Sequence, residues 1–193
     1  MSRTRDFDEN EALERAMDVF WRRGYEATSL SDLTEAMNIR RPSLYAAFGD
    51  KRALFEAALR LYVARHAASA RAVLQRKGGV EEAIRAYFER VVADAYASSE
   101  RPGCFCVNTM VELAPREPIF ELLTREHQLY LAELFRERLD RGIQTGELDA
   151  GLNAEACSKS LVVSVIGLTV MLKARPDRSF ADQTVDAVMS IFR

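Results

Sequence analysis

The chain of 193 residues is long enough for one domain, or for a small domain joined to a larger one. Its residues are 48% hydrophobic and 29% charged, which excludes bulk disorder, and its formal net charge of −2 excludes a basic field over the whole molecule. Three cysteines, an odd number, argue against a disulfide framework. The first residues lack the apolar segment of a signal peptide, and the longest apolar run, 161–172, is too short to span a bilayer. We therefore expect a cytoplasmic protein without a membrane partner.

Two helices are predicted before residue 39. The first covers about 8–23, where apolar residues recur on one face, and Gly24 ends it. Ser29 is suited to be the N-cap of the second helix, and Asp32 can complete a capping-box-like pair with it. Apolar residues then recur at the spacing i, i+3 and i+7, which predicts about two helical turns. Asn38 is suited to the left-handed conformation that ends such a helix.

A third short helix follows after a tight polar break. Pro42 suits its first turn, where the missing backbone N–H costs nothing, and Gly49 ends it. Leu44 and Phe48 are expected to point inward with Ala47. The outer face then consists of Arg41, Ser43, Tyr45 and Ala46. The second and third helices together predict a helix-turn-helix.

The rest of the chain is predicted to be helical as well, and we find no convincing strand pattern. A long helix should run from about Asp50 to residue 75 and break at Gly78 and Gly79. Three further helices are predicted, one that begins at residue 80, one over about 104–113 and one over about 118–141. Two more follow, one from an Asn153 cap to about residue 174 and one from a Ser179 cap to Phe192. The fold class is therefore all-α with about nine helices: a three-helix N-terminal unit and a larger C-terminal helical unit.

Positive charge is concentrated near the helix-turn-helix. Between Glu35 and Glu56 the sequence holds four basic residues (Arg40, Arg41, Lys51 and Arg52) against Asp50 alone, a net charge of +3. The acidic residues of the first helix would face away from this side. A local basic surface of this kind is typical of phosphate binding.

The run from Gly24 to Leu54, GYEATSLSDLTEAMNIRRPSLYAAFGDKRAL, resembles the N-terminal domain of the TetR/AcrR family of bacterial transcriptional regulators. The resemblance includes the G-Y-x-x-T-S entry, the S-L-Y-x-x-F core of the third helix and the following D-K. It implies a DNA-binding domain over 6–66, with the helix-turn-helix at about 29–48, and a ligand-binding and dimerisation domain over 67–193. It also implies a homodimeric repressor that binds a pseudo-palindromic double-stranded operator and is released by a small-molecule inducer. Activation of transcription is an alternative that the sequence leaves open.

Several side chains are candidates for DNA contact. Arg41 could reach a guanine edge or a phosphate, and Tyr45 a thymine methyl or a phosphate. Residues at helix starts lie where backbone N–H groups favour an anion. The resemblance supports Ser29, Ser43, Tyr45 and Lys51, whereas Arg40 and Arg41 depart from the residues usual in the family. The full predicted set is Thr28, Ser29, Ser31, Arg40, Arg41, Ser43, Tyr45 and Lys51.

The helix predicted over 153–174 is apolar almost all round between Leu161 and Leu172, so it must be covered on every side. We expect it to pair, with the last helix, against a second copy of the chain in a four-helix interface. The residues expected there are Ser160, Ser164, Gly167, Val188 and Phe192. A monomer that buries this helix centrally is the alternative.

A cavity lined by the fourth to seventh helices is the family expectation for an inducer. Aromatic walls with a few polar groups would suit an apolar or aromatic small molecule. The candidate lining residues are Tyr62, His66, Tyr87, Phe88, Phe105, Cys106, Thr109, Met110, His127 and Tyr130. For each of these residues an ordinary place in the core is the alternative.

The cysteines leave three readings open. The start of the helix at 104–113 could lower the pKa of Cys104 or Cys106 and make one of them a sensor of electrophiles or oxidants. Buried thiols that only fill the core are the plainer reading. Metal binding by these thiols with His66 and His127 matches no tight zinc spacing, so no metal or other cofactor is expected. A helical enzyme or carrier is the rival class of protein, but we find no catalytic constellation that would support it.

Overall fold

The computed structural model describes residues 7–97, 99–100 and 102–192, and within these ranges it contains helices and no strand. The predicted all-α class is confirmed, whereas the proposed start of the first domain, residue 6, lies outside the described residues. The helices are α1 Glu9–Arg23, α2 Leu30–Met37, α3 Arg41–Phe48, α4 Lys51–Leu74, α5 Val80–Ala97, α6 Phe105–Glu112, α7 Pro118–Thr145, α8 Ala154–Lys173, α9 Arg178–Met189 and the 3₁₀ turn Ser190–Phe192.

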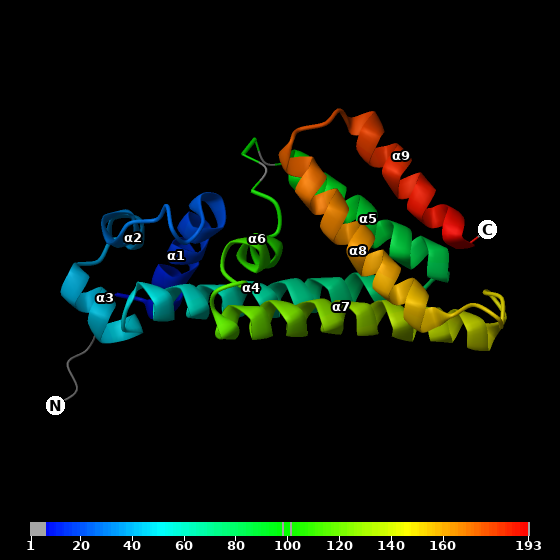
Figure 1. Cartoon of the computed structure of the whole chain (residues 1–193), viewed down its shortest axis with the longest axis horizontal. Coiled ribbons are helices and arrows are strands. Elements are labelled where there is room, and N and C mark those ends of the chain that lie inside the picture. Colours follow the sequence, from blue (N-terminus) through cyan, green and yellow to red (C-terminus); the bar gives the residue numbers. More distant parts are fainter. Residues whose placement is uncertain (1–6, 98, 101, 193) are drawn as a thin grey trace.

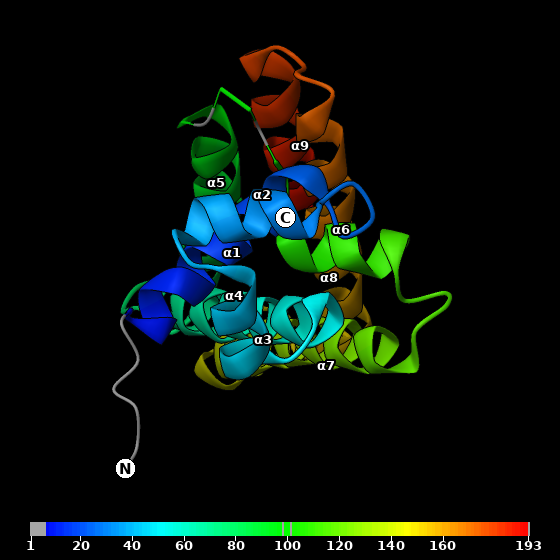
Figure 2. The ribbon, with the colours of Figure 1, turned by 90° about the vertical axis from the view of Figure 1, so that its left-hand side faces the viewer.

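The helix-turn-helix forms where the local sequence predicts it. The Ser29 side chain and the Asp32 side chain cap α2 reciprocally, and Asn38 ends α2 with a left-handed φ of 54°. Pro42 lies in the first turn of α3, and Gly49 follows its last turn. Figure 2 shows α2 and α3 at the end of the molecule that faces the viewer. They are therefore the most prominent elements at this end.

The long helix α4 joins the two ends of the molecule. It begins at an Asp50 cap, continues for 24 residues to Leu74, and packs against α1 and α7. Figure 1 shows it running from the helix-turn-helix into the C-terminal helices, with α7 beside it. The boundary expected between 66 and 67 falls within this continuous helix. Any tilt of α4 in one half of the molecule is therefore carried into the other half.

Two predicted details are wrong. The helix α7 continues to Thr145 instead of ending near residue 141, and Gly142 lies inside it, close to Val80. A Cβ atom there would stand 2.4 Å from Val80 Cγ2, so this glycine is required by packing and does not end the helix. The cap of α9 is Asp177, whose side chain accepts from Phe180 N, and not Ser179.

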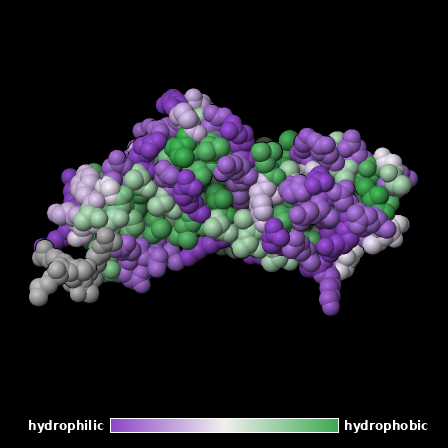
Figure 3. All heavy atoms as spheres, turned by 90° about the horizontal axis from the view of Figure 1, so that it is seen from below, coloured by the Kyte–Doolittle hydropathy of each residue, from purple (hydrophilic) through white to green (hydrophobic). Residues whose placement is uncertain are grey.

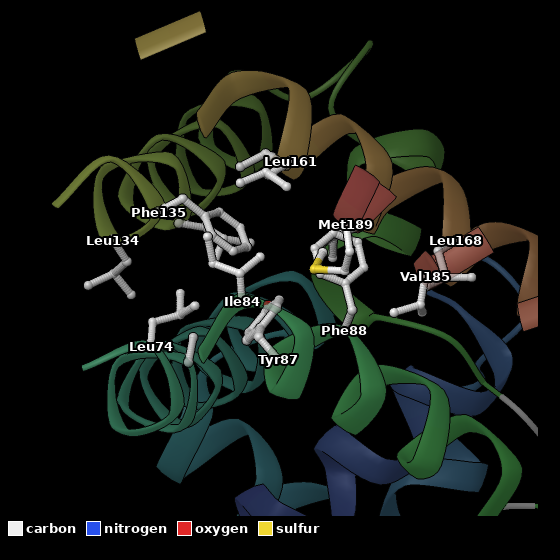
Figure 4. Close-up of a cluster of buried hydrophobic side chains, with 14 of the residues drawn as sticks. Leu74, Ile84, Tyr87, Phe88, Leu134, Phe135, Leu161, Leu168, Val185 and Met189 are labelled. Atoms are coloured by element: carbon white, nitrogen blue, oxygen red, sulfur yellow. The ribbon is translucent and has the colours of Figure 1, made fainter. Parts of the chain in front are cut away.

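The hydrophobic core has two parts. In the C-terminal part, side chains from α4, α5, α7, α8 and α9 converge, including Phe88, Phe135 and Leu161 (Figure 4). The N-terminal part joins α1–α4 to α6 and the start of α7. Phe55 stands at its centre, with ring centroids of Phe20, Phe105 and Phe120 at 4.8, 5.2 and 5.2 Å in edge-to-face geometry. The aromatic cluster therefore fixes the helix-turn-helix to the C-terminal helices.

The apolar helix α8 is long and apolar enough to cross a membrane by length and composition alone, and it is the one such helix among the described residues. Its inner face belongs to the C-terminal core, where Leu161, Leu168 and Leu172 are buried. Core helices have the same composition, so this observation is weak evidence for a membrane span.

On the outer side of α8, Val163, Val170 and Met171 are 68%, 46% and 46% exposed. A Cβ atom added at Gly167 would have no heavy atom within 4 Å, so the surface there is open. By contrast, the face seen from below in Figure 1 has hydrophobic residues among hydrophilic ones (Figure 3), as is usual for protein surfaces. The outer face of α8 is therefore an apolar surface without a partner in one chain.

Candidate nucleic-acid interface and cavity

The third helix presents its outer face to solvent. Leu44 is fully buried and anchors α3, whereas Arg41 and Ala46 are exposed and Tyr45 is 50% exposed. Ser43 is half-buried on the same helix. An eight-residue helix with its inner side fixed and a phenol and a guanidinium outside has the dimensions that fit a major groove.

The two neighbouring arginines differ in their contacts. Arg41 Nη2 donates to Ser31 Oγ at 3.1 Å, so these two exposed side chains join α3 to α2. Arg40 is the N-cap of α3 and makes no side-chain cap hydrogen bond, and its side chain is exposed. Arg40 can therefore reach a phosphate without breaking a contact to α2.

The start of α2 is less open than the sequence predicts. Thr28 is buried, and its hydroxyl donates to the Gly24 carbonyl at 2.6 Å, so this side chain is not presented to DNA. The Ser29 hydroxyl donates to Asp32 Oδ2 at 2.7 Å and accepts from Asp32 N at 3.1 Å. The Ser29 hydroxyl and the Ser29 backbone N–H both donate to this carboxylate, and they hold the pKa of Asp32 below its ordinary value. The capping box thus occupies the Ser29 hydroxyl, which the sequence analysis predicted as a contact to a phosphate.

Part of the local positive charge is already paired within the chain. Arg52 forms an ion pair with Glu117, at 2.9 Å, and so connects α4 to the start of α7. Lys51 is half-buried, with its Nζ 4.3 Å from the centre of the Tyr25 ring. Arg40, Arg41 and Lys51 therefore remain as the basic candidates for DNA.

The interior holds a cavity of about 490 Å³, within the range of small-molecule sites. Of the ten candidate residues, Tyr62, His66 and His127 line it. Tyr130 lines a second cavity, of about 320 Å³, together with His127. The other six candidates do not line the larger cavity: Tyr87 and Phe88 are in the C-terminal core, Phe105, Cys106 and Thr109 are buried on α6, and Met110 is half-buried.

The larger cavity also has a wall that sequence reasoning missed. Met17, Trp21 and Arg22 of α1 line it, as do Pro102, Gly103 and Cys104. Apolar periodicity predicts a buried face on the first helix, but no local signal shows that this helix faces a cavity. The contact depends on how the two ends of the chain pack together.

The two histidines form a polar pair within this cavity. Nε2 of His127 lies 3.0 Å from Nδ1 of His66, so one ring donates a hydrogen bond to the other. Burial lowers the pKa of both rings, and that of His127 falls to about 4, with the neighbouring His66 as a second cause. Both histidines are therefore neutral at pH 7.

This pair predicts a pH dependence of stability. Because the unfolded His127 binds a proton near its ordinary pKa of 6.5 and the folded one does not until about 4, its contribution is complete above pH 6.5 and is lost as the pH falls toward 4. The loss amounts to roughly 3 kcal/mol at most. Urea unfolding of wild type and His127→Gln between pH 7 and 4.5 measures it, and the variant should lose less stability on acidification. Equal losses in the two proteins would contradict the assignment.

Burial opposes the activation of a thiol by the start of α6, which is one of the three readings of the cysteines. Burial raises the pKa of Cys104, and the backbone amides of Cys106 and Val107 do not offset this effect. Burial also raises the pKa of Cys106. Cys104 lines the cavity and accepts a hydrogen bond from the Tyr62 hydroxyl at 3.4 Å. Among the described residues no three His, Cys, Asp or Glu side chains are grouped to hold a metal ion.

Comparison with known proteins identifies this architecture. Residues 12–58 match the model of bacterial regulatory proteins of the tetR family, and residues 80–188 match the tetracyclin repressor-like C-terminal domain. The uncharacterized HTH-type transcriptional regulator YezE of Bacillus subtilis (strain 168) is 32% identical over 99% of each chain. The HTH-type transcriptional repressor ComR of Escherichia coli (strain K12) is 44% identical over 58% of this chain and 54% of its own.

A solved structure gives the same result. The TetR family transcriptional regulator CifR, in a cysteine-mutant form complexed with 26-bp double-strand operator DNA, superposes with a TM-score of 0.87. It is 37% identical, and the match covers 100% of both chains. The chain belongs to the tetR family of bacterial regulatory proteins and is a DNA-binding transcriptional regulator.

Proposed function

We propose that this protein is a homodimeric repressor that places α3 of each copy in the major groove of a pseudo-palindromic operator. The observation that carries the proposal is the outer face of α3, where Arg41 and Tyr45 are exposed on a helix anchored by Leu44. The likeness over the full chain to CifR, whose structure is complexed with operator DNA, supports the same arrangement. The proposed contacts are Ser29, Ser31, Arg40, Arg41, Ser43, Tyr45 and Lys51.

The outer faces of α8 and α9 are the proposed dimer interface. Val163 and Val170 of α8 are exposed there, as is Ile191 in the 3₁₀ turn after α9, and Gly167 leaves room for the helix of a second copy. Ser160 is exposed, and Ser164, Val188 and Phe192 are half-buried, which leaves each of them some surface for a partner. Burial of such a surface is the usual reason for an apolar face without a partner in one chain.

The larger cavity is the proposed site of a small-molecule inducer that releases the repressor from its operator. A molecule there could shift α4, because α4 carries the cavity residue Tyr62. The same helix begins at the Asp50 cap that follows α3, so a shift would reach α3. The dimer has two conformations that differ in the distance between its two α3 helices. The inducer acts only through a difference in its affinity for these two conformations. The domains proposed from the sequence, 6–66 and 67–193, then meet within one rigid helix. A cytoplasmic location and the absence of catalysis complete the proposal.

Oxidant or electrophile sensing by a cysteine is the second candidate. Cys104 lines the cavity, so a reactive ligand bound there would meet its thiol. The raised pKa of Cys104 keeps the thiolate population low, which favours reversible binding over covalent sensing.

Two substitutions test the DNA-facing surface. Arg40→Ala should weaken all duplex sequences alike and make the slope of log K against log salt shallower by roughly 2 for a dimer, because each lost phosphate contact contributes about 0.9. Tyr45→Ala should lower operator affinity by roughly 1–3 kcal/mol and change the preference among operator variants. Gel-shift titrations on sites selected from random DNA measure both. Normal binding by the two variants would remove these residues from the interface.

A further inference from the structure

The larger cavity lies between the helix-turn-helix unit and the C-terminal helices, and α1 forms one of its walls. Met17, Asp18, Trp21 and Arg22 of α1 line it, opposite Val165 and its neighbours on α8. The residues of α1 from 12 onward fall within the part of the chain that matches the tetR regulatory model. A molecule in this cavity would therefore touch the unit that carries the recognition helix, without an intervening element.

Two polar contacts hold α1 against the segment before α6, of which Glu100, Pro102, Gly103 and Cys104 line the cavity. The indole Nε1 of Trp21 donates to the Gly103 carbonyl at 2.8 Å, and Arg22 pairs with Glu100 at 2.7 Å. On its other side this segment lies against α8, since a Cβ atom at Gly103 would stand 2.9 Å from Lys173 Cδ. Gly103 also has a φ of +75°, which favours glycine. Gly103 thus lies between Trp21 of α1 and Lys173 of α8.

The same segment continues into a second set of contacts with the helix-turn-helix unit. Glu112, at the end of α6, accepts hydrogen bonds from the backbone N–H groups of Tyr25 and Glu26 at 3.0 and 2.9 Å. Glu117 pairs with Arg52 at the start of α4. Through α6, the backbone near Gly103 is therefore connected to the turn between α1 and α2.

The lining indicates the chemistry of the ligand. Its arginines are already paired, Arg22 with Asp18 and Glu100, and Arg65 with Glu14. The Lys173 ammonium donates to Asn108, and the buried histidine pair is neutral. A cationic ligand would find the lining carboxylates already paired with arginines. For an anion, Lys173 is the lining cation without a carboxylate partner among the described residues, but it is exposed to solvent and would compensate little of the desolvation. Aromatic walls from Trp21 and Tyr62, with His66 as a hydrogen-bonding group, fit an uncharged aromatic molecule.

We propose that an uncharged, largely aromatic ligand binds between α1 and the C-terminal helices, against Trp21 and Tyr62, and separates Trp21 from the Gly103 carbonyl. Loss of this hydrogen bond moves α1, and with it the helix-turn-helix, directly. The inference rests on the proposed repressor function and adds to it the place of the ligand, its charge and the contact that responds.

Trp21 is the one tryptophan of the chain, so its fluorescence reports this site. The probes are N-phenyl-1-naphthylamine, which is uncharged, and 8-anilinonaphthalene-1-sulfonate, which adds a sulfonate to the same skeleton. With the full-length protein we expect saturable binding of one uncharged probe per chain, energy transfer from Trp21, and release of a selected operator. The sulfonate should bind at this site at least about tenfold more weakly, because its charge would lose water and could gain only the solvent-exposed Lys173.

Substitutions of equal size separate the cavity from the surface. Val165→Phe, or Val91→Phe if the first fails to fold, reduces the space and should abolish energy transfer to the uncharged probe. Val111→Phe is the matched control, since Val111 is 69% exposed and does not line the cavity. Trp21→Phe keeps an aromatic wall but lacks the indole N–H. It should still bind the probe, detected by the probe's own fluorescence, while its operator affinity without probe falls toward that of the probe-bound wild type.

The outcomes are distinct. Failure of the uncharged probe to bind, equal binding of the sulfonate at this site, or binding unaffected by Val165→Phe and Val91→Phe would overturn the placement or the chemistry of the ligand. Probe binding beside Trp21 with no effect on operator affinity, or a Trp21→Phe variant that behaves as wild type, would overturn the proposed response. Absence of operator binding by the wild type without any probe would instead refute the repressor function itself.

Discussion

Gly167→Arg is expected to convert the protein to a monomer and to lower its operator affinity by roughly 100-fold or more, since the second half-site is no longer bound at high effective concentration. In one chain the new side chain meets open space, because a Cβ atom at Gly167 has no heavy atom within 4 Å. Arginine is also a better helix former than glycine, so α8 should not be weakened. In a dimer, however, a large cation would stand in the apolar contact between the α8 helices. Analytical ultracentrifugation and gel shifts with the full operator measure both effects.

Val111→Arg is the matched control for this variant, because it also places an arginine at an exposed apolar position, on α6 and away from α8. It should remain dimeric and bind the operator as the wild type does. A Gly167→Arg protein that stays dimeric with full affinity would place the interface elsewhere.

Phe55→Ala is expected to lower the free energy of unfolding by roughly 3–5 kcal/mol, the range for removal of a fully buried aromatic ring. Phe55 is 1% exposed, and its ring is surrounded by those of Phe20, Tyr25, Phe105 and Phe120. The alanine leaves a cavity at the point where Phe55 of α4 joins α1 to α6 and α7. The transition is therefore expected to become less cooperative, with the helix-turn-helix unfolding before the C-terminal helices. Urea unfolding followed by circular dichroism and by Trp21 fluorescence measures both effects.

Two further substitutions calibrate this result. Phe55→Leu keeps most of the apolar volume but loses the edge-to-face contacts, so its cost should be smaller, roughly 1–2 kcal/mol. Val111→Ala, at an exposed position, should change stability by about 0.5 kcal/mol or less. A Phe55→Ala protein as stable as the Val111→Ala control would show that the aromatic cluster does not hold the two ends together.

The sequence by itself determined the elements whose causes are local. Ser29 with Asp32, Asn38 and Pro42 specify the ends of α2 and α3 through bonds and backbone conformations that lie within a few residues of each other. The spacing of apolar residues specified the remaining helices for the same reason, and the S-L-Y-x-x-F run indicated the family that the comparisons then showed.

Tertiary structure alone decided the features that depend on residues far apart in the chain. Position 142, inside α7, is a glycine because Val80 leaves no space for a side chain there. Local sequence alone would instead interpret this glycine as the end of the helix. The pKa of the Cys104 thiol is raised by burial although the residue lies at the start of α6, because desolvation by distant neighbours outweighs the nearby amides. The wall that Trp21 gives to the cavity exists only because α1 packs against a segment 82 residues away. No periodicity or local propensity encodes such a distance.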